Sequence, residues 1–212
     1  MDAEFWHQKW RDGKLPFSMD DITAQLKQNF HRLGLKPGAR VFVPLCGSTL
    51  DIGWLLSEGY YVVGAELSDR AITRLLQDIE IVPDHRDAGA MRHYYTEGLE
   101  IYGGDIFALT PAQLGKVDAI YDRAALAALP EEIREAYSEH LQELTGTAPQ
   151  LMICYDYEQE LMDGPPFAIN DEEVLTHYTS TYTVEKIAST PVDGGLNSKT
   201  SAQENVWLLS PL

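Results

Sequence analysis

Short runs of apolar residues alternate with longer stretches of helical periodicity from residue 39 onward, a pattern typical of a parallel sheet covered by helices. Five apolar runs predict strands at residues 40–47, 60–67, 99–107, 117–124 and 150–157. Several of these runs are apolar at almost every position, so we expect interior strands with both faces covered. Two further β-rich runs, at residues 181–190 and 204–210, are separated by a polar loop and predict an antiparallel hairpin at the sheet edge.

Helical periodicity lies between the predicted strands and supplies their covering layers. Apolar stripes at spacings of three and four predict helices within residues 50–59, 69–79 and 130–144, and a shorter one follows Asn170. The stripes contain Leu50, Trp54, Leu55, Ala71, Ile72, Leu75, Leu76, Ile133, Tyr137, Leu141 and Leu144. The sequence therefore predicts one α/β domain over residues 1–212, with a doubly wound, mostly parallel sheet of seven strands whose last strand is reversed. Residues 1–38 are expected to form a helical cover over the strand ends.

Composition and charge limit the possible partners. A chain of 212 residues with 44% hydrophobic residues can bury one substantial core, and its formal net charge of −17 disfavours a nucleic-acid partner. No apolar run approaches the roughly 20 residues that span a bilayer, and Cys46 and Cys154 lie in apolar runs where cysteine acts as a small hydrophobe. We expect a soluble, cytoplasmic protein without a membrane partner. Because no long exposed apolar stripe remains, we also expect a monomer.

Candidate chemistry gathers at the carboxyl ends of the predicted strands, where ligands bind in open parallel sheets. The first strand ends in a turn at Gly47 that lets a ligand approach the backbone, although such a glycine is also found in plain turns. The three-glycine pattern of a pyrophosphate-binding turn is missing, which argues against NAD and FAD. Glu66 ends the second strand, where a carboxylate can accept hydrogen bonds from both hydroxyls of a ribose. The turn and the glutamate together predict a ligand that contains adenosine.

Two further strand ends carry candidate site residues. Asp105 can approach an adenine edge with Ile106 as an apolar wall, or it can simply cap a helix. Arg123 ends the fourth strand among small apolar residues, an uncommon place for an arginine. Its planar guanidinium can hold the carboxylate of a methionine moiety or an anionic acceptor, or it can pair with Asp122 or another nearby carboxylate.

Aromatic residues near the amino terminus suggest a lid. Trp6, Trp10 and Phe17 can cover a flat ligand, or they can pack a helix onto the core. The six histidines show no metal-ligand spacing with one another or with cysteine, and no serine lies in a nucleophile-elbow pattern. We therefore expect neither a metal nor an acyl-enzyme intermediate.

At these residues the sequence resembles the thiopurine S-methyltransferase family, in its bacterial form. FWHQKW, VFVPLCG, GAELS, DIF, YDRAAL and GPPF stand in the family's order and spacing along nearly the whole chain. The resemblance implies a class I methyltransferase fold, Rossmann-like, with S-adenosylmethionine as methyl donor. It also implies that four residues contact this cofactor and that Phe17 lines the acceptor pocket. The four are Trp10, Leu45, Glu66 and Arg123.

The match is fuller in the cofactor half than in the acceptor half. Many bacterial members have Gly-Phe-His-Gln where this chain has residues 15–19, and a lysine where it has Ser48. The run SKTSAQENVW also lacks a counterpart of an arginine proposed to assist the acceptor in some members. The resemblance implies methyl transfer to a small thiol, with Arg123 favouring the thiolate. Two alternatives remain: a nitrogen, oxygen or inorganic sulfur, selenium or tellurium acceptor, and a non-catalytic module that binds an adenosine ligand.

Overall fold

The computed structural model describes residues 3–13, 21–196 and 200–212, and its centre is a mixed sheet in the order β3-β4-β5-β2-β1-β6-β7-β9-β8. The strands β5, β2, β1, β6 and β7 are parallel, and β9 runs antiparallel to both β7 and β8. The predicted mostly parallel sheet with a reversed last strand is confirmed. The strands are β1 (Arg40–Val43), β2 (Tyr61–Glu66), β3 (Asp84–Ala88), β4 (Met91–Thr96), β5 (Leu99–Gly103), β6 (Ala119–Arg123), β7 (Gln150–Asp156), β8 (Tyr182–Pro191) and β9 (Gln203–Pro211).

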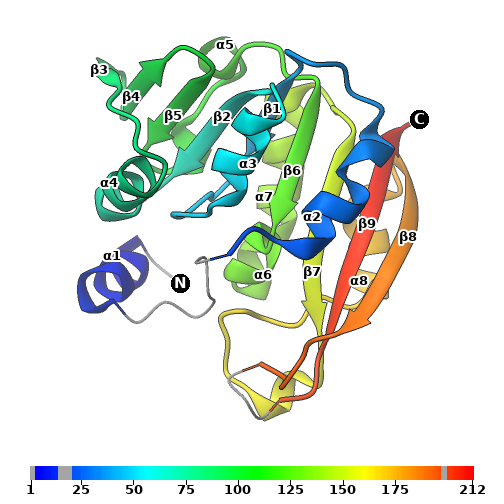
Figure 1. Cartoon of the computed structure of the whole chain (residues 1–212). Coiled ribbons are helices and arrows are strands. Elements are labelled where there is room, and N and C mark those ends of the chain that lie inside the picture. Colours follow the sequence, from blue (N-terminus) through cyan, green and yellow to red (C-terminus); the bar gives the residue numbers. More distant parts are fainter. Residues whose placement is uncertain (1–2, 14–20, 197–199) are drawn as a thin grey trace.

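Helices cover both faces of the sheet (Figure 1). One apolar layer joins the sheet to α2 (Ala24–Asn29), the 3-10 helix η1 (Phe30–Leu33), α3 (Asp51–Ser57) and α4 (Asp69–Asp78). The other joins it to α5 (Pro111–Leu114), α6 (Ala125–Ala128), α7 (Glu131–Thr145) and α8 (Asp171–Tyr178). Two short 3-10 helices, η2 (Ile106–Ala108) and η3 (Gln159–Leu161), complete the described helical elements.

The predicted count of seven strands is wrong, because β3 and β4 add a hairpin beside β5. Nearly all of β3 is exposed and it consists of Asp84, His85, Arg86, Asp87 and Ala88, so it has no apolar alternation. In β4 the inward positions are Met91 and a histidine, which is a weak strand signal. The other seven strands correspond to the five predicted runs and the predicted hairpin.

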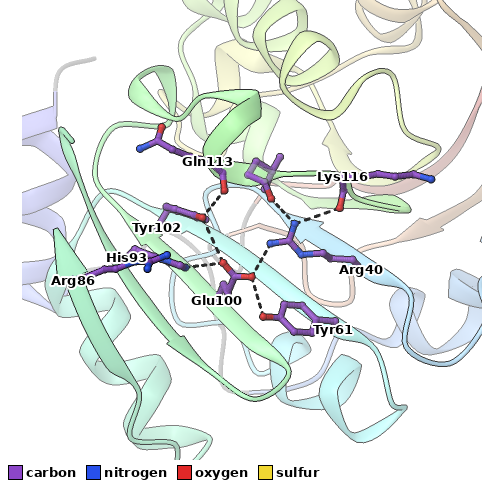
Figure 2. Close-up of polar contacts among 9 residues, drawn as sticks. Arg40, Tyr61, Arg86, His93, Glu100, Tyr102, Gln113 and Lys116 are labelled. Atoms are coloured by element: carbon purple, nitrogen blue, oxygen red, sulfur yellow. Dashed lines mark hydrogen bonds and ion pairs between the residues drawn. The ribbon is translucent and has the colours of Figure 1, made fainter. Parts of the chain in front are cut away.

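A polar cluster around Glu100 of β5 attaches this hairpin to the sheet (Figure 2). The Glu100 carboxylate accepts hydrogen bonds from Arg40 at 2.8 Å and from the Tyr61 hydroxyl at 2.9 Å. His93 of β4 approaches it to 2.7 Å and stacks on Tyr102 with ring centroids 4.4 Å apart. Burial acts to raise the pKa of Glu100, but the bonds from Tyr61 and Arg40 outweigh it and lower that pKa. The hairpin is thus held by an ionised carboxylate near the amino ends of β1 and β2.

The predicted helical stripes hold for α4 and α7 and differ in α3. In α4 the buried positions include Ile72 and Leu75, as the spacing predicted. In α3, Leu50 and Trp54 are only half-buried, whereas Asp51 and Ile52 are fully buried. A fully buried aspartate at the start of a helix needs hydrogen-bond partners, and these lie in the candidate site.

The N-terminal helix α1 (Ala3–Asp12) lies on the side of the molecule toward which the parallel strands point (Figure 1). It contacts α4, where Arg70 donates a hydrogen bond of 3.4 Å to the Arg11 carbonyl. No residue of α1 is fully buried. Among the described helices, none is long and apolar enough to cross a bilayer.

Candidate active site

The turn after β1 forms the first wall of the candidate site. Leu45 and Gly47 both have positive φ, at 45° and 57°. Glycine adopts this region freely, whereas the left-handed conformation of Leu45 costs about 1 kcal/mol. The amide of Cys46 donates to the Ala65 carbonyl of β2 at 2.9 Å, so the turn is attached to the neighbouring strand.

Glu66 connects this turn to the end of β2. One of its carboxylate oxygens accepts the Gly47 amide at 2.8 Å and the other accepts the Ser68 amide at 2.7 Å. The side chain is buried, with Glu66 only 6% exposed. A carboxylate oxygen can accept more than one hydrogen bond, so both oxygens of Glu66 retain capacity for a ligand hydroxyl. The structure brings the two residues of the predicted adenosine site together, while their contacts to a ligand stay a prediction.

Two carboxyl groups at the strand ends are buried enough to favour their protonated forms. Burial raises the pKa of Glu66 to about 7, although amide donors from Ser68 and Gly47 act to lower it. Burial also raises the pKa of Asp122 to about 6, against the Tyr137 hydroxyl and nearby amides. Both groups therefore bind protons in the folded protein at a pH where the unfolded chain has lost them.

These shifts predict that the ligand-free protein loses stability as the pH rises. The folded-state pKa of Glu66 lies above its unfolded value, so its contribution is complete below about pH 4.5 and lost by about pH 7. The full contribution of Glu66 is about 3 kcal/mol. Urea unfolding at pH 5 and pH 8 should show a smaller pH difference in Glu66→Gln than in wild type. Equal pH differences in both proteins would contradict the shift.

Asp105 and Ile106 border the same edge of the sheet from the end of β5. Asp105 is exposed and accepts the Phe107 amide at 3.0 Å, so the predicted capping role is confirmed. Ile106 is buried, and Gly104 donates its amide to the Glu66 carbonyl at 2.9 Å. The motif also contains Phe107, which sequence reasoning missed and which is 41% exposed at this edge. Contact with an adenine ring stays a prediction for both Asp105 and Ile106.

Arg123 is the last residue of β6, followed by Ala124 with φ 59°. It donates to the Tyr155 hydroxyl of β7 at 3.4 Å. Asp122 instead accepts from the Tyr137 hydroxyl of α7 at 2.9 Å, and successive strand residues point to opposite faces. The alternative that Arg123 pairs with Asp122 is therefore wrong.

The structure places acidic groups near Arg123 that sequence reasoning missed. Burial acts to lower the pKa of Arg123, but Tyr155, Tyr121 and two carboxylates, Asp51 and Glu204, outweigh it and raise that pKa. Asp51 and Glu204 thus act on Arg123 electrostatically, while an ion pair between Arg123 and a nearby carboxylate stays a prediction. The two carboxylates come from α3 and β9, elements far apart in the sequence.

Asp51 is fully buried and bound on both oxygens. Thr23 donates to it from its amide at 2.7 Å and from its hydroxyl at 2.8 Å. The buried Tyr121 hydroxyl donates at 2.7 Å. The three bonds join the segment before α2, the start of α3 and strand β6, so Asp51 holds the N-terminal part of the chain against the sheet.

The predicted aromatic lid is described only in part. Trp6 and Trp10 are half-buried on α1, and the Trp6 ring meets Phe5 edge-on with centroids 5.5 Å apart. Phe17 lies outside the described residues. Within the described ranges, no group of three or more histidine, cysteine, aspartate or glutamate side chains is arranged to hold a metal ion.

Comparison with solved structures identifies the fold. A SAM-dependent methyltransferase from Anabaena variabilis superposes with a TM-score of 0.68 at 15% identity, covering 99% of this chain and 95% of that one. Magnesium protoporphyrin IX methyltransferase from Synechocystis, solved with bound S-adenosylhomocysteine, has a TM-score of 0.62 at 13% identity. That match covers 97% of this chain and 99% of the other. The fold is that of the class I S-adenosylmethionine-dependent methyltransferases.

Sequence comparison defines the family within this class. The family model for thiopurine S-methyltransferase matches residues 1–210. A thiopurine S-methyltransferase from Xanthobacter autotrophicus is 49% identical over 210 residues, which is 99% of both chains. This chain belongs to the thiopurine S-methyltransferase family, and the resemblance of its motifs is confirmed.

Proposed function

We propose that this protein transfers the methyl group of S-adenosylmethionine to the sulfur of a small heteroaromatic thiol, as the name of its family indicates. The single observation that supports the donor most strongly is the buried Glu66 carboxylate, which holds the Gly47 turn and keeps acceptor capacity. Full-length identity of 49% to a thiopurine S-methyltransferase supports the acceptor class.

The residues around the turn fit an adenosine ligand, and we assign them its binding. Glu66 accepts the ribose hydroxyls, while Leu45 and Gly47 offer backbone to the ligand. Asp105 and Ile106 face the adenine, and Trp10 covers the site from α1. Bound S-adenosylmethionine supplies a sulfonium methyl group, and S-adenosylhomocysteine is the product. Because this methyl is already strongly electrophilic, the protein mainly has to align the two reactants and exclude water.

In this proposal Arg123 acts on the methyl acceptor. Its positive charge favours the ionised form of a nearby thiol, and the thiolate is the form that attacks carbon. Bound S-adenosylmethionine would supply the methyl carbon to which the thiolate sulfur of the acceptor bonds, and S-adenosylhomocysteine would leave with the electron pair of the broken bond. The proposal also assigns Arg123 a second role, binding the methionine carboxylate of the cofactor, and the two roles can be separated by experiment.

Replacing Arg123 with alanine should lower kcat/KM for a heteroaromatic thiol at least tenfold, because the thiolate loses its neighbouring cation. The assay follows the methylated product over a range of acceptor concentrations, with S-adenosylhomocysteine affinity measured beside it. A fall in turnover with unchanged affinity assigns Arg123 to the acceptor, and a fall in both assigns it to the cofactor. Arg74→Ala, an exposed position on α4, is the matched control. Wild-type kinetics in Arg123→Ala would exclude both roles.

We also infer that residues 1–212 act as one monomeric domain in a reducing, cytoplasmic compartment. Cys46 and Cys154 are both free and buried, which suits such a compartment. The large apolar side chains exposed in the described ranges are scattered over separate elements and form no common stripe. Gel filtration with light scattering tests the monomer.

A further inference from the structure

Three polar side chains form a row across the carboxyl ends of β6 and β7 and the start of β9. Tyr155 lies directly opposite Glu204 in the antiparallel pairing of β7 with β9. Its hydroxyl accepts a hydrogen bond from Arg123 at 3.4 Å, and Glu204 is its cross-strand neighbour. Arg123 and Glu204 are therefore the two neighbours of Tyr155 on the sheet face that carries Asp51.

The two carboxylates near Arg123 differ in how the fold uses them. Asp51 is fully buried, and its hydrogen bonds to Thr23 and Tyr121 give it a structural task. Glu204 is half-buried at the start of β9, opposite Tyr155 in the strand pairing. Glu204 thus adds a carboxyl group near Arg123. It does not join separate segments of the chain as Asp51 does.

The carboxylates around Arg123 argue against a site that accepts a second negative group beside the thiolate. Arg123 provides one positive charge, whereas two carboxyl groups, Asp51 and Glu204, lie within its electrostatic range. Burial raises the pKa of Glu204, although Arg123 opposes this shift. The buried surroundings reduce screening by water, so a second negative group on an acceptor meets repulsion that Arg123 alone does not offset. The remaining groups on this face, such as Thr190 of β8 and the Gln25 amide that binds it, are neutral.

We propose that Glu204 determines acceptor specificity, favouring thiols that carry no further negative charge over thiols that also carry a carboxylate. The inference rests on the proposed function, because it concerns the acceptor end of the same site. It assigns a residue that neither the motifs nor the sequence patterns singled out. Like-charge repulsion of this kind is a common way for a site to reject one of two similar ligands.

Two aromatic thiols of nearly equal shape test this role: 4-mercaptobenzamide, which is neutral apart from its thiol, and 4-mercaptobenzoate. We expect wild type to prefer the amide, and Glu204→Gln to reduce the ratio of kcat/KM values at least tenfold, equivalent to about 1.4 kcal/mol. The change should come mainly from a lower KM for the benzoate. Glu185→Gln, which removes the same charge from an exposed position on β8, should leave the ratio as in wild type.

Calorimetric binding of both thiols to the protein saturated with S-adenosylhomocysteine separates this inference from the proposed function. A binding preference for the amide that Glu204→Gln abolishes supports the inference, even if neither thiol is methylated, in which case the proposed acceptor class is wrong. The same amide-to-benzoate ratio in wild type and Glu204→Gln overturns the inference, whether or not methylation occurs. If Glu204→Gln does not fold, Glu204→Thr is a second neutral variant with a residue that suits a strand.

Discussion

Replacing Glu66 with alanine should weaken the binding of S-adenosylhomocysteine about 100-fold, or about 2.7 kcal/mol. At pH 8, above the raised pKa of Glu66, the wild-type carboxylate is ionised and can offer charge-assisted hydrogen bonds to two ribose hydroxyls. Each such bond contributes about 1.5 kcal/mol or more. Alanine also removes the acceptor of the Gly47 and Ser68 amides, so the turn loses its attachment. Titration calorimetry of the purified protein measures the change directly.

Glu58→Ala is the matched control for this experiment. Glu58 is exposed at the end of α3, and its removal changes the net charge by the same amount. We expect its affinity to stay within twofold of wild type. If wild type does not bind S-adenosylhomocysteine at all, the proposed methyl donor is wrong and only the fold assignment remains. If wild type binds and Glu66→Ala binds equally well, the donor stands but the role of Glu66 is wrong.

Asp51→Ala should lower the free energy of unfolding by about 3 kcal/mol, a large share of the stability of a typical domain. The substitution leaves the buried Tyr121 hydroxyl and both Thr23 donors without their acceptor. Asp51→Asn keeps one acceptor oxygen and should lose about half as much. Urea unfolding at constant pH, followed by far-ultraviolet circular dichroism, measures all three proteins.

An exposed aspartate tests whether the effect comes from burial. Asp163→Ala should change the free energy of unfolding by less than about 0.5 kcal/mol, as is usual for surface positions. Stability of Asp51→Ala within that range would show that these hydrogen bonds contribute little.

Because Asp51 attaches the segment that follows residue 20, Asp51→Asn should also raise KM for the acceptor more than it changes kcat.

The parallel strands were predictable because their buried residues follow one another along the sequence. In β6 and β7 almost every residue is buried, since both faces are covered by helices. The β3–β4 hairpin escaped prediction because its stability comes from elsewhere. Glu100 binds Arg40, Tyr61 and His93, and these contacts depend on strands that meet only in the folded chain.

The candidate site also contains residues that were predictable from the sequence and residues that were not. Gly47 and Glu66 were predictable because strand ends of a parallel sheet meet, so two strands and their spacing place both residues. Asp51 was not predictable, since it reads as a polar helix position until Thr23 and Tyr121 approach it from 28 and 70 residues away in the sequence. Glu204 likewise becomes a neighbour of Arg123 only through the register of β9 on β7.

The hairpin also affects how the protein behaves at high concentration. Without it, β5 would be the edge of the sheet, and an apolar strand with open backbone groups pairs readily with strands of other chains. The actual edge strand, β3, exposes Asp84, Arg86 and Asp87, and the opposite edge, β8, carries charges and ends at Pro191. Charged residues and proline at sheet edges oppose such pairing. The segment with the weakest sequence pattern is therefore the one that protects the sheet from aggregation.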